Sequence, residues 1–448
     1  MGAGFAGLVA ARDLVAAGPS VVVLEARDRV GGRVLNHDIG DGKVIEVGGQ
    51  WVGPTQDRVY ALARELGIET FPTYETGESL ARIGEKRYRF TEDVPRMNPV
   101  AMADLAQAVL RLDRLARRVP LEEPWRAPGA TRWDSQTLET WLHRNVRTRR
   151  VRSLLHLFMS TVFATEPAMV SLLHALFYVH SGTSFDVLTR FSGGAQQDRF
   201  VGGSQLVAIR LAEALGEAVV LGSPVRRIER TSGVVAVESD RVTVRARRVI
   251  VAIPPTLAGR ITYDPILPGG RDQLTQRLPQ GSVIKAQAIY DEPFWRGEGL
   301  SGIAADTGSP VSFTVDNSPM DGSPGVLVGF VEGDRARQLG RLEPGDRRRI
   351  VLESLGRSFG RRAASPRDYV ELDWSEEEWT RGCYGAHFPP GVWTRYGSAL
   401  REPVDLIHWA GTETASVWNG YMDGAVRSGE RAAAEVLELL DEQAPTGD

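Results

Sequence analysis

The stretch GAGFAG, residues 2–7, decides the fold, because it fits the spacing G-x-G-x-x-G. In a doubly wound α/β domain, Gly2 would allow a tight turn and Gly4 would let the backbone approach a pyrophosphate. Gly7 would let the following helix contact a strand. These three glycines alone are a weak signal, so the prediction depends on the residues that come after them in the chain.

The next two segments agree with the glycine pattern. The segment LVAARDLVAAG has a helical pattern, and VVVLE (21–25) then reads as a strand that ends in an acid. Glu25 stands where a carboxylate accepts hydrogen bonds from a ribose hydroxyl, and the helix N-terminus would face the phosphates with its positive end. Glycines, helix, strand and acid in this order predict a dinucleotide-binding domain.

The strand that should precede the fingerprint is missing, because only Met1 stands before Gly2. That strand is central in a doubly wound sheet, and its loss would leave backbone groups and a core face uncovered. We therefore expect the natural chain to begin several apolar residues upstream, with Met1 an internal valine codon read as a start.

Composition excludes several classes of protein. The chain has 448 residues, enough for two or three domains, with 42% hydrophobic and 25% charged residues. A formal net charge of −4 gives no reason to expect a nucleic-acid partner. No apolar run approaches the length of a membrane span. A single cysteine, Cys383, excludes an internal disulfide and predicts a cytoplasmic protein.

Two further glycine clusters extend the predicted cofactor site. The segment ARDRVGGRV places Arg33 where it can pair with a phosphate, and VGGQWVGPTQ places Gly49 and Gln50 under a flat ring. Near the other end of the chain, WAGTETA contains Gly411. A nicotinamide enzyme needs mainly the first fingerprint, so these clusters favour a flavin dinucleotide, FAD.

The predicted secondary-structure pattern changes twice along the chain. A helical region about 71–200 interrupts the α/β pattern, which returns near residue 201, and strands are expected around 283–290 and 311–315. The predicted fold is α/β, with a Rossmann-like (doubly wound) FAD-binding domain assembled from three segments and an inserted α+β substrate domain. The FAD-binding domain is predicted at 1–70, 201–274 and 377–440, the substrate-binding domain at 71–200 and 275–376, and a polar tail at 441–448.

Lys285 is unusual because the chain has only three lysines, and this one stands in GSVIKAQAIY, which reads as a buried strand. Its ammonium either reaches solvent along its own stem or serves a buried function. A compact ammonium with an easily shifted pKa can hold a water where a guanidinium would not fit.

Ten stretches together resemble the flavin-dependent monoamine oxidases over nearly the whole chain. They are, in order, LEARDRVGGR, VGPTQ, APGATRWD, RFVGGSQ, AIPPTL, GSVIKA, EPFWR, GCYGAHFPPG, AGTETA and GYMDGAV. The resemblance implies that Lys285 reaches the flavin N5 through a water. It implies that Tyr384 and Tyr421 stand face to face before the flavin and guide the amine.

The resemblance also implies roles for other residues. In animal members, the cysteine that matches Cys383 is bonded to the flavin 8α carbon, whereas many bacterial relatives lack it, so we predict covalent FAD here. Without the resemblance, a lone cysteine reads as an inert core residue. Further positions implied near the cofactor are Trp374, Val225 at the adenine, Glu413 at the pyrophosphate and Met422 at the pyrimidine end. Gln196 or its neighbour Gln197 would line the substrate cavity, and Gln196 is our choice.

The implied reaction is oxidation of a primary amine to an aldehyde, with O₂ as acceptor and release of ammonia and hydrogen peroxide. Phe313 matches a gating tyrosine of the animal enzymes and predicts a neutral cavity for aryl-alkyl amines. Asp316 leaves a diamine such as putrescine open, and the many arginines leave an L-amino acid open.

Two other readings remain, a flavin-dependent desaturase or isomerase and a flavin-binding protein without activity. The expected partners are the amine and O₂, with a homodimer by family analogy. We expect no membrane anchor, because the chain ends without the C-terminal membrane helix of the animal enzymes. The histidines His156, His174 and His180 are too far apart for a local metal motif.

Overall fold

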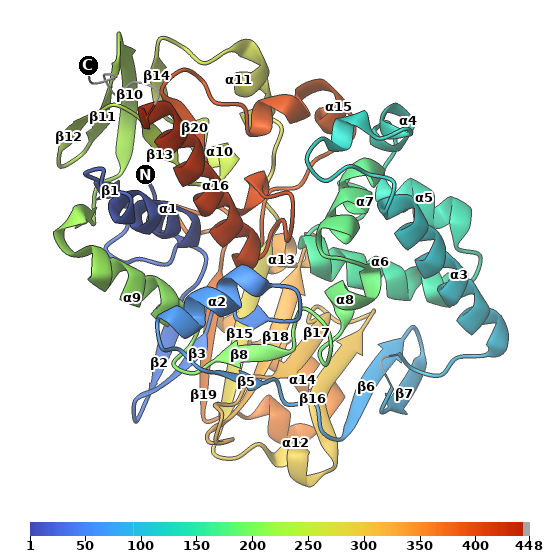
Figure 1. Ribbon diagram of the computed structural model, residues 1–448. Coiled ribbons are helices and arrows are strands. Elements are labelled where there is room, and N and C mark those ends of the chain that lie inside the picture. Colours follow the sequence, from blue (N-terminus) through green and yellow to red (C-terminus); the bar gives the residue numbers. More distant parts are fainter. Residues whose placement is uncertain (93, 442–448) are drawn as a thin grey trace.

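The computed structural model describes residues 1–92 and 94–441. Figure 1 shows the elements that carry the glycine loops gathered with the last helix, α16, on one side of the molecule. Helices α3 to α8 lie on the other side, and a large β-sheet extends below both groups. The predicted polar tail lies, from residue 442 on, outside the described residues.

The glycine-rich start forms the predicted helix and strand. Helix α1 (Phe5–Ala16) follows the fingerprint, and β1 (Val23–Leu24) pairs in parallel with β9 (Val219–Val220). A second parallel pair joins β13 (Val249–Val251) to β20 (Ile407–Trp409). Segments far apart in the sequence thus build this part of the molecule.

Met1 and Gly2 lie between β1 and β13. The Gly2 amide donates to the Leu24 carbonyl at 2.8 Å, and the Met1 carbonyl accepts from the Ala252 amide at 3.0 Å. In the described residues, the expected parallel sheet therefore consists of two separate pairs joined by this short link.

The elements around these pairs complete the nucleotide-binding side. Helix α16 (Met422–Asp441) packs on α1, and a Cβ at Gly429 would come within 2.4 Å of the Ala6 carbonyl oxygen, so the close approach requires glycine there. The remaining elements of this side are α2 (Asp57–Glu65), α9 (Gln205–Leu215), β10 (Val225–Thr231), β11 (Val234–Ser239), β12 (Thr243–Ala246), β14 (Thr262–Asp264), α10 (Pro255–Ala258) and α11 (Gly269–Thr275).

The large sheet, as far as the structure describes the chain, has seven strands in the order β19, β15, β18, β17, β16, β6, β7. Neighbours are antiparallel except β16 and β6. The strands are β19 (Asp368–Asp373), β15 (Val283–Tyr290), β18 (Gly325–Glu332), β17 (Phe313–Asp316), β16 (Leu300–Asp306), β6 (Glu78–Ile83) and β7 (Lys86–Phe90). Every residue of β15 and β18 is buried, as predicted for the strand that contains Lys285.

The prediction of a helical region from about 71 onward is wrong for residues 78–90. These form the hairpin β6–β7 at the edge of the large sheet. Two smaller groups also went unpredicted: the hairpin β2 (Asn36–Gly40) with β3 (Lys43–Glu46), and the sheet of β4 (Trp51–Val52), β8 (Asp198–Phe200) and β5 (Thr70–Pro72).

The helical layer begins with α3, after the hairpin β6–β7. Helix α3 (Pro99–Ala116) starts with the Asn98 side chain accepting from the Ala101 amide at 2.8 Å, and proline occupies its first turn. Its partners are α4 (Ala130–Asp134), α5 (Leu138–Asn145), α6 (Arg149–Phe163), α7 (Leu172–Ser181) and α8 (Phe185–Thr189). Their apolar faces pack into one hydrophobic core, so the helices form a single packed layer beside the large sheet.

Further helices cover the sheet ends and the surface: α12 (Phe294–Gly297), α13 (Asp334–Leu339), α14 (Pro344–Phe359) and α15 (Val392–Tyr396). All strands of the large sheet come from the two ranges predicted for the substrate domain. The domain boundaries themselves stay a prediction. Among the helices of the described residues, none is both long and apolar enough to cross a membrane.

Candidate active site

A cavity of about 500 Å³ collects most of the predicted site residues. Those that line it are Gly2, Gly4, Glu25, Arg33, Gly49, Gln50, Gln196, Val225, Lys285, Phe313, Cys383, Tyr384, Gly411, Tyr421 and Met422. Three predicted residues are not among its lining residues: Gly7, Trp374 and Glu413. Residues separated by most of the chain length therefore meet around one space.

The three residues outside the lining have structural contacts. A Cβ at Gly7 would lie 1.9 Å from the Gly2 carbonyl oxygen, so this glycine permits close packing behind the loop. The Trp374 indole is buried and donates to the Val47 carbonyl at 2.9 Å. Glu413 is buried in an ion pair with Arg33.

The N-terminus of α1 makes one end of the cavity suited to an anion. Gly4 is its N-cap residue, no side chain caps it, and Gly4, Phe5 and Ala6 line the cavity. Uncapped amides and the positive end of the helix favour a pyrophosphate there. Glu25 beside them has its carboxylate fixed by the amides of Ala3, at 2.6 Å, and Arg27, at 3.0 Å.

Arg33, which lines the cavity, forms an ion pair with the buried Glu413 behind the lining. The guanidinium donates to both carboxylate oxygens, at 2.5 and 3.0 Å, and to the Tyr384 carbonyl at 2.9 Å. Burial acts against ionisation of both groups, but each partner keeps the other charged: the pKa of Arg33 is raised and that of Glu413 is lowered. The pair ties the first glycine region to the Cys383–Tyr384 segment.

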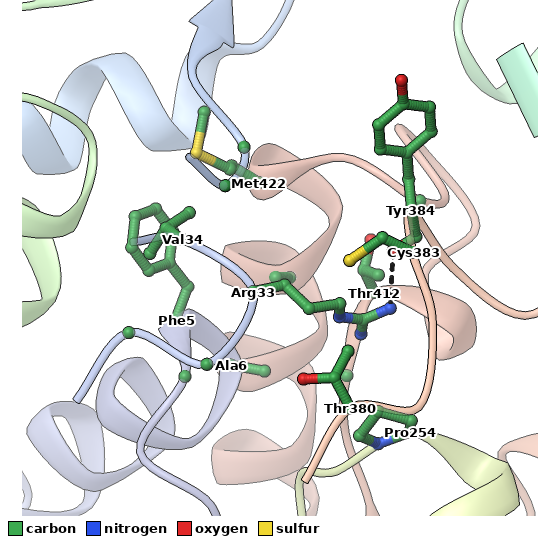
Figure 2. A pocket seen from close by; sticks show the side chains of 18 of the residues that line it. Phe5, Ala6, Arg33, Val34, Pro254, Thr380, Cys383, Tyr384, Thr412 and Met422 are labelled. Atoms are coloured by element: carbon green, nitrogen blue, oxygen red, sulfur yellow. Dashed lines mark hydrogen bonds between the residues drawn. The ribbon is translucent and has the colours of Figure 1, made fainter. Parts of the chain in front are cut away.

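Cys383 presents its sulfur to the cavity. Figure 2 shows its side chain pointing across the space toward Val34 and Phe5, whereas the ring of Tyr384 extends away from Arg33. Burial raises the pKa of the Cys383 thiol to about 12, so the thiol is neutral in the protein without a ligand. Both side chains come from one loop, yet they face different parts of the cavity.

One face of the large sheet forms the cavity floor. Lys285 on β15 lies directly opposite Phe330 on β18, and Phe330 lies opposite Phe313 on β17. Directly opposed residues share a face of a sheet, so these three side chains turn toward the same space, and all three line it. The register of the sheet therefore sets the spacing between them.

Lys285 is held in a fixed position inside this floor. Its ammonium donates to the Gly48 carbonyl at 2.7 Å and to the side-chain oxygen of Gln50, and it lies 5.9 Å from the Trp51 ring centroid. Burial, partly offset by the charge of Glu46, lowers its pKa to about 7. A buried ammonium whose pKa is lowered in this way can hold a water in a fixed place and can give up its proton more easily than an exposed lysine.

Rings enclose the far end of the cavity. This aromatic end is formed by Trp51, Phe158, Tyr178, Phe191, Phe313, Phe330, Tyr384 and Tyr421. Tyr178 and Tyr421 have ring centroids 6.0 Å apart, and Trp51 contacts Phe191 and Phe330. The Tyr384 hydroxyl donates to Glu332 at 2.9 Å, and burial raises the pKa values of Tyr384 and Tyr421, so both phenols stay neutral.

The structure gives the surroundings of Gln196, Gln197 and Asp316, three residues whose roles the sequence left open. Gln196 lines the cavity, and its side-chain oxygen has no hydrogen-bond partner in the described protein, whereas Gln197 bonds to Gly193 and Asp198. Asp316 is buried and turned away: Arg296 pairs with its carboxylate at 2.7 Å and the Trp295 indole donates to it at 2.8 Å.

The residues around this cavity fit a flavin dinucleotide. The uncapped α1 terminus suits the pyrophosphate, and the buried Trp51 indole N–H, which no described protein group accepts from, can serve a bound ligand. Sequence reasoning missed Trp51, Tyr178, Phe330 and Glu332. Glu332 could have been found, because it ends the apolar run VLVGFVE just as Lys285 interrupts another.

A fold and a site of this kind define a flavin-dependent oxidoreductase that acts on amines. The sequence model of the family "Flavin containing amine oxidoreductase" matches residues 5–437. The chain belongs to this family, and it is an amine oxidase with a flavin cofactor.

Individual relatives cover nearly the whole chain. A putative flavin-containing monoamine oxidase, AofH, of Mycobacterium tuberculosis is 45% identical over 442 residues, which are 98% of this chain and 96% of that protein. Human amine oxidase [flavin-containing] B is 39% identical and covers 98% of this chain and 86% of its own length.

Solved structures agree in fold. A putrescine oxidase bound to putrescine has a TM-score of 0.94 and 39% identity, and cyclohexylamine oxidase from Brevibacterium oxydans has a TM-score of 0.94 and 35% identity; each comparison covers 98% of both chains. The names of these relatives give different amines, so the similarity in fold does not decide the substrate class of this chain. That class has to be argued from the residues of its own cavity.

Proposed function

We propose that this protein oxidises primary aryl-alkyl amines, such as phenylethylamine or tyramine, to aldehydes, with O₂ as acceptor and release of ammonia and hydrogen peroxide. The observation that supports this proposal is the composition of the aromatic end. Eight aromatic side chains line one part of the cavity, and the carboxylate of Asp316, which a diamine could have used, is bound by Arg296 and Trp295 instead. An aryl ring is stabilised by such walls, whereas a second charged group on the substrate would be buried without a partner.

FAD, when bound, supplies the two-electron oxidation of the substrate carbon–nitrogen bond and passes the electrons to O₂. The uncapped α1 terminus would hold its pyrophosphate, Glu25 its ribose and Val225 its adenine. Met422 would lie at the pyrimidine end. The sulfur of Cys383 faces the cavity, which supports a covalent link, although its neutral thiol must first lose a proton.

The protein's own residues orient the amine. Tyr384 and Tyr421 offer neutral rings whose faces attract an amine by about 0.5–2 kcal/mol if it enters as a cation. Lys285, fixed by Gly48 and Gln50, would hold a water at the flavin edge. Gln196 offers an unpaired carbonyl oxygen to the substrate.

The other substrate classes have less support. A diamine needs an acid in the cavity, and Asp316 is engaged with Arg296 and Trp295 outside it. An L-amino acid needs an arginine free to bind its carboxylate, and Arg33, whose guanidinium donates to the Tyr384 carbonyl, is already paired with Glu413. A cytoplasmic location and a homodimer stay predictions.

A peroxide-coupled assay tests the proposal. The purified flavoprotein would be given phenylethylamine, tyramine, putrescine and several L-amino acids, and kcat/KM would be compared. We expect kcat/KM for the aryl-alkyl amines to exceed that for putrescine by more than tenfold. A preference for putrescine or for an amino acid would overturn the proposed substrate class while leaving amine oxidation intact.

A further inference from the structure

Glu332 is an acid at the end of the cavity floor. It is the last residue of β18, two positions after Phe330, so the alternation of a strand turns both side chains to the same face. It lies opposite Val283, next to the Lys285–Phe330 pair. The register thus directs a carboxyl group toward the wall of the aromatic end, although Glu332 itself is only 5% exposed.

Hydroxyl groups surround this carboxyl group. Tyr384 donates to one oxygen at 2.9 Å, and Thr161 of α6 and Ser312 donate to the other, each at 2.8 Å. Tyr384 and Thr161 both line the cavity. Glu332 therefore stands one hydrogen bond behind the cavity wall and joins the large sheet to a phenol and to the helical layer.

This arrangement is costly to the fold. Burial raises the pKa of Glu332, against the effect of the three hydroxyls and of the positive charge on Arg335. A buried acid with a raised pKa destabilises the folded state once it ionises, so glutamine at this position should be tolerated equally well or better by the fold. A costly ionisable group beside a substrate cavity indicates a functional reason for its presence.

We propose that Glu332 is a positioning residue for amine oxidation, which fixes the Tyr384 ring through its hydroxyl and makes that ring more electron-rich. The hydrogen bond holds the phenol proton away from the cavity. A phenol that donates to a carboxylate carries more negative charge than one that donates to a neutral acceptor, so its face attracts an amine more strongly. The inference rests on the proposed role of Tyr384 in guiding the amine.

The test is a double-mutant cycle on the flavoprotein. Glu332→Gln keeps an acceptor for Tyr384 without the charge, and Tyr384→Phe removes the hydroxyl. A charged acceptor exceeds a neutral one by about 1 kcal/mol, so Glu332→Gln should lower kcat/KM for phenylethylamine about fivefold, with a higher KM because the ring attracts the amine less and a lower kcat because the ring is held less firmly. Tyr384→Phe should cost at least as much, and adding Glu332→Gln to it should cause no further loss.

Stability is the second readout. The melting temperature of Glu332→Gln should equal or exceed that of the wild type, with an unchanged ratio of flavin to protein. A matched control is Asp104→Asn, a buried acid of α3 that accepts from the Arg147 and Thr148 amides. Burial acts to raise the pKa of Asp104, but these hydrogen bonds lower it, so the ionised carboxylate stabilises the folded state. The Asp104→Asn control should therefore have a lower melting temperature and an unchanged kcat.

Three outcomes would overturn the inference. Unchanged kinetics in Glu332→Gln would mean that the Tyr384 ring needs no anchor, and additive losses in the double variant would mean that Glu332 acts independently of Tyr384. A selective loss of putrescine oxidation would make Glu332 a direct anchor for a second ammonium. If the wild type prefers an amine other than the proposed class, the cycle is run on that amine, so the two proposals fail separately.

Discussion

Replacing Lys285 by methionine measures the cost of burying an ammonium in the large sheet. Lys285 is 3% exposed, and burial is the main cause that lowers its pKa from the ordinary 10.5 to about 7. The unfolded chain therefore binds a proton at this side chain over a pH range in which the folded protein has released it. Within that range, the stability of the wild type should rise with pH, relative to a variant that has no proton to bind.

The size of the effect follows from the two pKa values. Between pH 7.5 and pH 9.5, the difference in unfolding free energy between wild type and Lys285→Met should change by about 2.5 kcal/mol in favour of the wild type. The lost hydrogen bonds to Gly48 and Gln50 add a contribution that is nearly the same at both pH values. The change with pH thus isolates the cost of the charge.

Urea unfolding followed by tryptophan fluorescence supplies the measurement, with wild type and variant studied in parallel at both pH values. Lys86→Met, on the exposed face of β7, controls for the loss of a lysine as such. A free-energy difference that stays constant from pH 7.5 to 9.5 would refute the reasoning, because it would mean that the ammonium keeps its proton equally well in both states.

The other predictions concern the tyrosines and the cofactor. Tyr421→Leu should lower kcat/KM for phenylethylamine about tenfold, since a ring face worth roughly 0.5–2 kcal/mol is lost, and absorbance should show the flavin retained; an unchanged kcat/KM would contradict a guiding role. After acid precipitation, the flavin should remain with the protein pellet, and Cys383→Ala should release it to the supernatant. Release from the wild type would show that Cys383 forms no bond to the flavin.

Site residues could be predicted from the sequence where their residue type stands out from that of their neighbours in the chain. Glycines, a lone lysine in an apolar run and the resemblance to the monoamine oxidases led to Lys285, Tyr384 and Tyr421, which the fold brings to one cavity. Trp51 and Phe191 gave no such mark, because an aromatic residue in a sequence is more often part of a core. Their role depends on which face of a strand or loop meets the cavity, and only tertiary contacts decide that.

The same limit explains the errors in the fold. Residues 78–90 form the hairpin β6–β7 although the region around them is helical. The segment ESLARIGEKRYRF alternates apolar and polar residues around a glycine turn, so a local reading would have found it. The pairing of β6 in parallel with β16, far along the chain, leaves no local signal.

The large sheet gives the site a precision that loops would not supply. Lys285 lies opposite Phe330, and Glu332 follows two residues later on the same strand and face. A slip of one residue between β15 and β18 would turn one strand's set of side chains to the opposite face. The apolar residues that fill both strands prevent such a slip, because it would bury ionisable groups in the core on the far side. The packing that stabilises the sheet therefore also sets the distance between Lys285, proposed to lie at the flavin edge, and Glu332, proposed to hold the ring of Tyr384.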